Sequence, residues 1–261
     1  MIEVTDTQLY SWIALYVWPF LRLLGLFTAA PILGEQAVPV KIKVGLAATL
    51  AFVIAPSLPT PPPVAPTSFA GLMIVIQQVL IGLALGFVMK IVFTAVQSAG
   101  EYIGLQMGLS FASFFTPGLG SSNVLSRFLH TLAILLCLSF NVHLLLIELL
   151  SESFILIPIS DASLHGAGWW KIASLGGFIF SAGLSLAMPI ITALLLINLA
   201  MAVLNRTAPQ FSIYSVGFAI TLLSGLLLMT TLSSSFGGLF ARFFEVGLRV
   251  VRETATLLGG G

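Results

Sequence analysis

Residues 100–120 read GEYIGLQMGLSFASFFTPGLG and lie between two long apolar segments. Gly100, Gly104 and Gly108 recur at helical spacing, and a phenylalanine-rich stretch then ends at Pro117-Gly118. Polar groups and irregular backbone at membrane depth are tolerated only where protein buries them or where they line a cavity. This stretch is therefore the first candidate for a pore, a gate or a substrate site.

The composition defines the class of protein. Hydrophobic residues make up 58% of the 261-residue chain and charged residues 7%, whereas a soluble domain has about 25% charged residues. The sequence therefore predicts an all-α integral membrane protein with no separate soluble domain. The formal net charge is +1 and the basic residues are scattered, so there is no electrostatic footprint for nucleic acid. A single cysteine excludes an internal disulfide.

Apolar segments of about 20 residues predict membrane helices. Residues 172–204 are too long for one simple span, and Gly176-Gly177 and Pro189 predict a kink or a break there. Gly225 and the cluster at 233–238 likewise interrupt the last segment. Basic residues divide almost equally between the two sides, so the positive-inside rule fixes no orientation. The six predicted segments are 11–30, 42–58, 69–93, 128–150, 172–204 and 211–240.

Three stripes of small residues predict close helix packing, because small side chains let helix backbones approach each other. Packing within the chain and packing between subunits are both open. If the chain stood alone, we would expect all three stripes to lie on exposed faces. The stripes are Gly82/Gly86, Gly100/Gly104/Gly108 and Gly177/Ser181/Ser185.

Ionisable residues inside apolar segments need partners. Arg22 lies in the middle of the first predicted helix, so it should have a partner or face water. His130, His143 and Glu148 lie in one predicted helix, but 100° per residue separates the two histidines by about 140°, which disfavours a proton path. The motifs of metalloproteases, P-loop nucleotide-binding proteins and serine hydrolases are absent from the sequence. We predict no enzyme, no metal and no cofactor.

Six short motifs occur in order along the chain: RLLG (22–25), APILG (30–34), VPVKIKVGLA (38–47), GLQMGLSFA (104–112), LNRTAPQ (204–210) and VGF (216–218). Together they resemble the FliR family of flagellar export-gate proteins. Virulence injectisomes contain a more distantly similar counterpart. Two residues depart from the family pattern: Thr116 stands where an acidic residue is common, and Ala219 stands where proline usually follows Gly-Phe.

The resemblance implies a non-enzymatic subunit of a type III protein export channel in the bacterial inner membrane, within the flagellar basal body. It implies long, kinked helices arranged as hairpins in a helical hetero-oligomer with FliP and FliQ, with FlhB and FlhA nearby. Residues 1–175 would be similar to FliP and would include a plug loop at 106–120, and residues 176–261 would be similar to FliQ. The exported cargo would be unfolded flagellar proteins.

The plug prediction also has a physical basis, since hydrophobic constrictions gate by dewetting and methionine repacks readily. An ordinary buried loop is the alternative. The predicted gate residues are Gln106, Met107, Gly108, Phe111, Phe114, Phe115, Thr116, Pro117 and Gly118, and the predicted assembly residues are Arg22, Gly82, Gly86, Gly100, Gly104, Asn205, Arg206 and Pro209.

A secondary transporter for a small solute is a competing interpretation, because transporters also have broken helices. Such a protein is expected to contain an internal repeat, and the sequence shows no convincing one.

Overall fold

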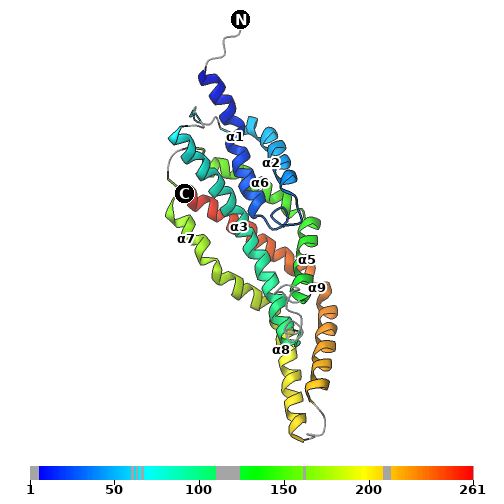
Figure 1. Ribbon diagram of the computed structural model, residues 1–261. Helices are drawn as coiled ribbons and strands as arrows, with labels where there is room; N and C mark the ends of the chain where they lie inside the picture. The colour runs from blue at the N-terminus through cyan, green and yellow to red at the C-terminus, as the bar shows by residue number, and fades with distance from the viewer. Residues whose placement is uncertain are drawn as a thin grey trace. The chain divides into compact units, whose positions relative to one another are not determined.

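The chain folds into helices (Figure 1). The computed structural model describes residues 6–59, 62, 64–65, 68–109, 124–160, 163–207 and 213–260. No strand occurs among these residues, which confirms the all-α prediction. The helices are α1 (Asp6–Ala29), α2 (Val40–Ile54), η1 (Ala55–Ser57), α3 (Phe69–Gln106), α5 (Val124–Ser139), α6 (Val142–Leu156), α7 (Gly166–Ser174), α8 (Gly176–Thr207) and α9 (Ile213–Gly259).

The described residues contain four helical segments long and apolar enough to cross a membrane, or five if α5 and α6 form one bent span. The apolar stretch Ile13–Ala29 of α1 is shorter than these. All six predicted segments fall on helices, and the structure is that of an integral membrane protein.

Two helices are longer than the sequence predicted. α3 continues past residue 93 to Gln106, and α9 continues through Gly225 and the serine cluster to Gly259. The hydroxyl of Ser233 donates to the Thr230 carbonyl of the same helix at 2.7 Å. This hydrogen bond satisfies the serine hydroxyl within the helix. The helix is continuous here, so the predicted interruption of α9 is wrong.

The predicted helix 128–150 is in fact two helices, α5 and α6, which meet at an angle of 68°. Asn141 directly precedes α6 and has a φ of 57°. Asparagine is one of the few non-glycine residues that adopt this left-handed conformation readily. His130 therefore lies on α5 and His143 on α6, so the single-helix geometry assumed for them is wrong. The helix is interrupted only at Leu175, between α7 and α8, so Gly176-Gly177 and Pro189 both lie inside α8 without ending it. Gly166–Thr207 forms one segment of membrane-spanning length.

The helices form two compact units, each built from segments far apart in the sequence. Unit 1 comprises Met1–Ile91, Asn141–Leu175 and Phe244–Gly261, and unit 2 comprises Val92–Phe140 and Gly176–Phe243. α3 and α9 each contribute to both units. The predicted division after residue 175 coincides with the junction of α7 and α8. The similarity of the two parts to FliP and FliQ stays a prediction.

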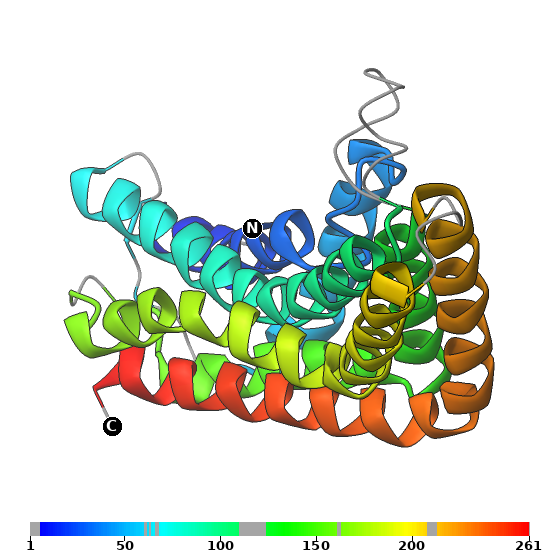
Figure 2. The same cartoon turned by 90° about the horizontal axis from the view of Figure 1, so that it is seen from below.

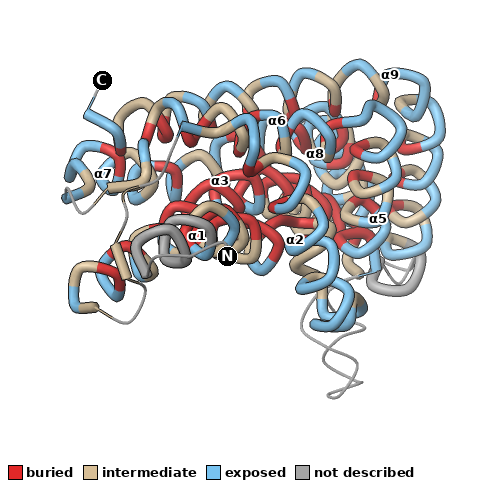
Figure 3. Tube along the Cα trace, turned by 90° about the horizontal axis from the view of Figure 1, so that it is seen from above, coloured by how far each residue is buried: buried red, intermediate tan, exposed pale blue. Residues whose placement is uncertain are grey.

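Unit 1 is held by close approach of α1 to α3. A Cβ atom on Gly25 would lie 2.7 Å from the Val79 carbonyl oxygen, and one on Gly86 would lie 2.8 Å from the Leu26 carbonyl oxygen. A Cβ atom on Gly82 would clash with the Arg22 carbonyl oxygen. The first small-residue stripe is therefore buried within the chain, as the run of buried residues along α3 in Figure 3 illustrates.

Unit 2 places α5 and α8 against the second half of α3. A Cβ atom on Gly100 would lie 2.5 Å from the Ser126 Cα, and one on Gly183 would lie 2.8 Å from the Ala95 carbonyl oxygen. α8 and the first half of α9 run side by side as a hairpin (Figures 1 and 2). Gly104 is also buried.

The expectation that all three stripes are exposed is therefore wrong. The first stripe packs within unit 1, and Gly100 of the second packs within unit 2. Only the third stripe is exposed at all three of its positions, Gly177, Ser181 and Ser185 on α8. Gly82, Gly86 and Gly100 of the first two stripes instead pack closely against other helices of the same chain.

Candidate gate region at the end of α3

The last turn of α3 is closed by a glycine. The Gly108 N–H donates to the Leu105 carbonyl at 3.1 Å, and the Leu109 N–H donates to the Gly104 carbonyl at 2.9 Å. Gly108 has a φ of 80°. Two such hydrogen bonds around a left-handed residue form the Schellman motif that ends many helices. Gly108, one of the predicted gate residues, thus fixes the point at which the chain leaves α3.

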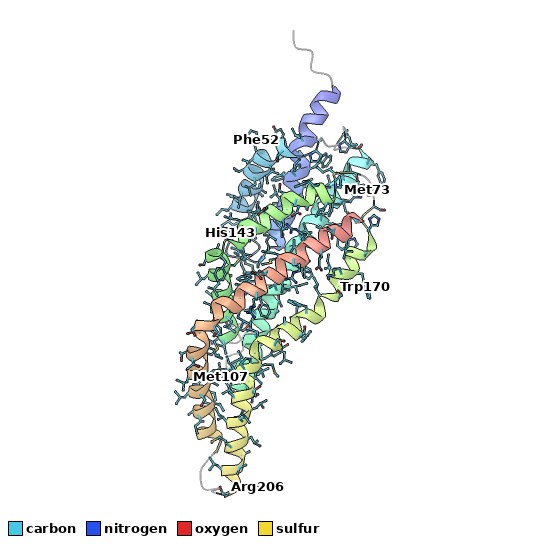
Figure 4. The ribbon with its side chains drawn as sticks, turned by 180° about the vertical axis from the view of Figure 1, so that it is seen from behind. Phe52, Met73, Met107, His143, Trp170 and Arg206 are labelled. Carbon is cyan, nitrogen blue, oxygen red and sulfur yellow. The ribbon has the colours of Figure 1, made fainter. Side chains whose placement is uncertain are left out.

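Met107 is locked against α9. Its side chain is 1% exposed, and a Cβ atom on Gly225 would lie 2.7 Å from its Sδ atom. The Thr221 hydroxyl lies 3.4 Å from the Met107 carbonyl oxygen, to which it donates. Gly225 therefore makes room for a methionine rather than interrupting the helix. Figure 4 labels Met107 among the helices of this region.

An apolar cavity of about 650 Å³ lies on one side of this turn in unit 2. Leu109 and Val124, which flank the undescribed residues 110–123, both line it. Its two hydroxyl-bearing residues, Thr230 and Ser233, donate to carbonyls of their own helix. The other lining residues are Met107, Leu125, Phe128, Leu132, Leu136, Leu222, Leu226, Met229, Phe236 and Gly237.

A second cavity of about 610 Å³ lies beside the same turn and is more polar. It brings together the carboxamides of Gln106, Asn198 and Asn205 from α3 and α8. Within the described part of the chain, none of these three side chains hydrogen-bonds to another residue. The remaining lining residues are Leu105, Gly108, Met201, Ala202, Gly217, Phe218 and Thr221.

The residues at 105–109 thus divide between two environments. Met107 and Leu109 line the apolar cavity, whereas Gln106 and Gly108 line the polar one. The structure therefore brings Gln106 and Gly108 together with Asn205, which was predicted only for assembly. The predicted plug residues Phe111, Phe114, Phe115, Thr116, Pro117 and Gly118 lie outside the described residues, and so does Pro209.

Arg22 finds its partners inside unit 1, which confirms that it needs a partner. Its Nε donates to Gln78 Oε1 at 2.8 Å, its Nη1 to Ser153 Oγ at 3.0 Å, and its Nη2 to the Ile157 carbonyl at 2.9 Å. The guanidinium also lies 4.0 Å from the centre of the Phe154 ring. Arg22 is fully buried, and it ties α1 to α3 and to the α6 segment without a neighbouring subunit. A role in assembly stays a prediction.

Arg206 lies at the opposite extreme of exposure. It occupies the last turn of α8 and is exposed, at the tip of the α8–α9 hairpin (Figure 4). Its position at the end of α8 agrees with the gap between the last two predicted segments, and its role in assembly stays a prediction. Asn205 beside it is likewise exposed.

The sequence interpretation missed several polar residues, two beside the candidate gate and two beside Arg22. Asn198 and Thr221 are polar positions within α8 and α9, and Gln78 and Ser153 serve Arg22. A polar side chain within an apolar helix is a usable signal for Asn198 and Gln78, because such groups must find partners. Nothing in the sequence pairs Ser153 with Arg22, which is 131 positions away.

The described residues contain no group of three or more histidine, cysteine, aspartate or glutamate side chains placed to hold a metal ion. His130 and His143 lie on different helices, as noted above. The described part of the region consists of packed apolar helices with two cavities at the end of α3.

The fold and these cavities define a helical membrane protein with an apolar region at a helix end. Comparison with known sequences then identifies the group. The family described as bacterial export proteins, family 1, matches residues 13–246, and the chain belongs to this family.

Named relatives agree with the match. The flagellar biosynthetic protein FliR of Escherichia coli (strain K12) is 49% identical over 233 residues, which cover 89% of each chain. FliR of Pectobacterium carotovorum subsp. carotovorum is 46% identical over 87% of each chain. FliR of Bacillus subtilis (strain 168) is 27% identical over 92% of this chain and 94% of its own. The resemblance stated from the motifs is confirmed.

Proposed function

We propose that the chain is a non-enzymatic subunit of the flagellar type III export gate and that it helps to form and plug the channel for unfolded flagellar proteins. The observation that carries the proposal is the match to FliR proteins over nearly the whole chain. The proposal places the protein in the bacterial inner membrane, in one complex with FliP and FliQ and near FlhB and FlhA.

The region at the end of α3 supports the plug. A gate for unfolded protein must exclude ions yet accept any side chain, which favours deformable apolar contacts. Leu109 and Val124 bring both ends of the loop to an apolar cavity that also contains Met107 and Met229. The two described residues that border the predicted plug therefore lie in a surface of the same apolar chemistry as its phenylalanines.

Membership of the complex is tested by replacement in a bacterium that lacks its own FliR. The chain should restore motility and secretion of flagellar proteins, and an affinity tag on it should recover FliP and FliQ in one large complex. Expressed alone it should be degraded or aggregate. A long-lived monomer that binds a small solute would favour a transporter.

The plug is tested by deletion of residues 110–119. We expect an assembled complex that is leaky to small ions, because the apolar seal is lost while both helices that flank it remain. Ion sensitivity of the cells and membrane conductance measure the leak. Replacing exposed Phe69 and Phe180 by alanine is the matched control for loss of phenylalanine. A deletion variant that assembles and stays ion-tight would show that the loop is not the seal.

A further inference from the structure

The carboxamide cavity in unit 2 has a chemistry that the plug does not use. Gln106, Asn198 and Asn205 line it together with Met201 and Phe218. Its volume of about 610 Å³ lies within the range of about 300–1,000 Å³ typical of ligand pockets. No described residue lining it carries a charge, which disfavours ions, phosphates and carboxylates as ligands.

The three side chains come from the C-terminal parts of two helices, α3 and α8. Met201 and Ala202 lie three and four residues after Asn198 and four and three residues before Asn205, so all four share one face of α8. Gln106 is the final residue of α3, where the Schellman motif at Gly108 holds the turn. The cavity is therefore built on helical elements and not on the loop.

A carboxamide carries two N–H donors and a carbonyl acceptor, which is the same pair of functions as a peptide main chain. The three amides have no hydrogen bond to another described residue, so their donors and acceptors are available. Leu105, Met201 and Phe218 supply apolar walls, and hydrogen bonds strengthen where the local dielectric is low. An extended polypeptide that leaves water needs such partners, because an unpaired main-chain amide is costly to desolvate.

We infer that this cavity binds the main chain of the exported polypeptide through Gln106, Asn198 and Asn205, with little regard to side-chain sequence. The inference rests on the proposed export function and adds the group that the gate recognises. Binding through main-chain amides explains how one site serves cargo proteins of different sequence.

The test is photo-cross-linking in cells that carry the complete export apparatus. A benzoylphenylalanine is placed at Ala202, which lines the cavity, or at Ala200, which is exposed and does not line it. Two flagellar cargo proteins of unlike composition are each fused to a stably folded domain that arrests them during export. Ala202 should cross-link to both cargoes, and Ala200 to neither.

A second set of variants isolates the amides. Asn198→Leu and Asn205→Leu should lower the Ala202 cross-link yield about two- to tenfold, the size of one net hydrogen bond. Leu199→Met, on the same helix but outside the cavity, should leave it unchanged. Recovery of FliP and FliQ with each variant measures assembly separately from binding, and the cross-link from the otherwise unchanged chain decides the matter if a leucine variant does not assemble.

The outcomes separate the two proposals. If the unmodified chain assembles but restores no export, the proposed function is wrong. If export is restored and Ala202 cross-links only to export-gate subunits, to one cargo alone, or no more than Ala200 does, the export function stands and the inference is overturned.

Discussion

Two polar clusters, one in each unit, differ in how their side chains are paired. In unit 1 the buried Arg22 is bonded to Gln78, Ser153 and a backbone carbonyl, all from the same chain. In unit 2 Gln106, Asn198 and Asn205 border a cavity with no hydrogen bond to another described residue. Internally paired polar groups hold helices together, whereas polar groups left open can bind something else. The Arg22 cluster thus holds the helices of unit 1 together, and the three carboxamides of unit 2 lie beside the candidate gate.

Loss of Arg22 should have the largest effect. Arg22→Ala removes the buried donor shared by Gln78, Ser153 and the Ile157 carbonyl and leaves a cavity in unit 1, so we expect a destabilisation of about 3–5 kcal/mol and little protein in the membrane. Arg22→Lys should recover only part of this, because an ammonium lacks the planar fork that reaches three acceptors. Protein level and thermal unfolding in detergent measure the effect. The exposed Arg249 is the control, and a wild-type unfolding temperature for Arg22→Ala would refute the structural role of the network.

Gly82→Ala tests whether close helix approach holds unit 1. Its added Cβ would meet the Arg22 carbonyl oxygen and the Leu26 nitrogen, which are backbone atoms and cannot rotate away. We expect a loss of about 1–3 kcal/mol in the free energy of unfolding. Gly45→Ala in α2 meets nothing within 4 Å and should stabilise that helix by about 0.5–1 kcal/mol. Equal effects of the two substitutions would contradict the packing argument.

Gly108→Ala tests the turn that ends α3 in unit 2. A left-handed φ of 80° costs a residue with a Cβ about 1–2 kcal/mol, and the Cβ would lie 3.1 Å from Phe218 Cδ2. Combining Gly108→Ala with Phe218→Ala removes the ring and leaves the backbone strain. Thermal unfolding should show a loss for Gly108→Ala that the double variant recovers only in part, with Gly238→Ala as the unhindered control. Full recovery would show that the φ of Gly108 is not the cause.

Arg206→Ala should have the smallest effect on the chain itself. The side chain is exposed at the end of α8, so the free energy of unfolding should change by less than about 0.5 kcal/mol. Recovery of FliP and FliQ should fall, because we expect this arginine to bind a carboxylate or helix-end carbonyls of a neighbouring subunit. Arg206→Lys keeps the charge and should retain more of the complex. A fully assembled Arg206→Ala complex with altered conductance would reverse the assignment from assembly to gating.

The sequence located the helices well because long apolar runs have few alternatives in a membrane. Its errors lie where local signals compete with helix continuation. Gly225 was interpreted as an interruption, but a Met107 side chain fills the space beside it. Asn141, a single polar residue, ends a segment that composition alone presents as one span.

The candidate site was found in part. The motif around Gln106, Met107 and Gly108 has an unusual composition, so the sequence singled it out. Asn198 and Thr221 come from helices about 90 to 115 positions later in the chain, and no local pattern announces which polar residues of a long helix face the same cavity.

The sequence by itself determined an all-α membrane protein of the FliR-containing export family, because apolar length and motif order are properties of the chain read in one dimension. Only the tertiary structure decided that Gly82, Gly86 and Gly100 pack within the chain, that Arg22 is satisfied by Gln78 and Ser153, and that the end of α3 separates an apolar cavity from an amide-lined one. The reason is physical. A small or polar residue states a requirement for close contact or for a hydrogen bond, and the partner that meets the requirement is set by how distant helices pack.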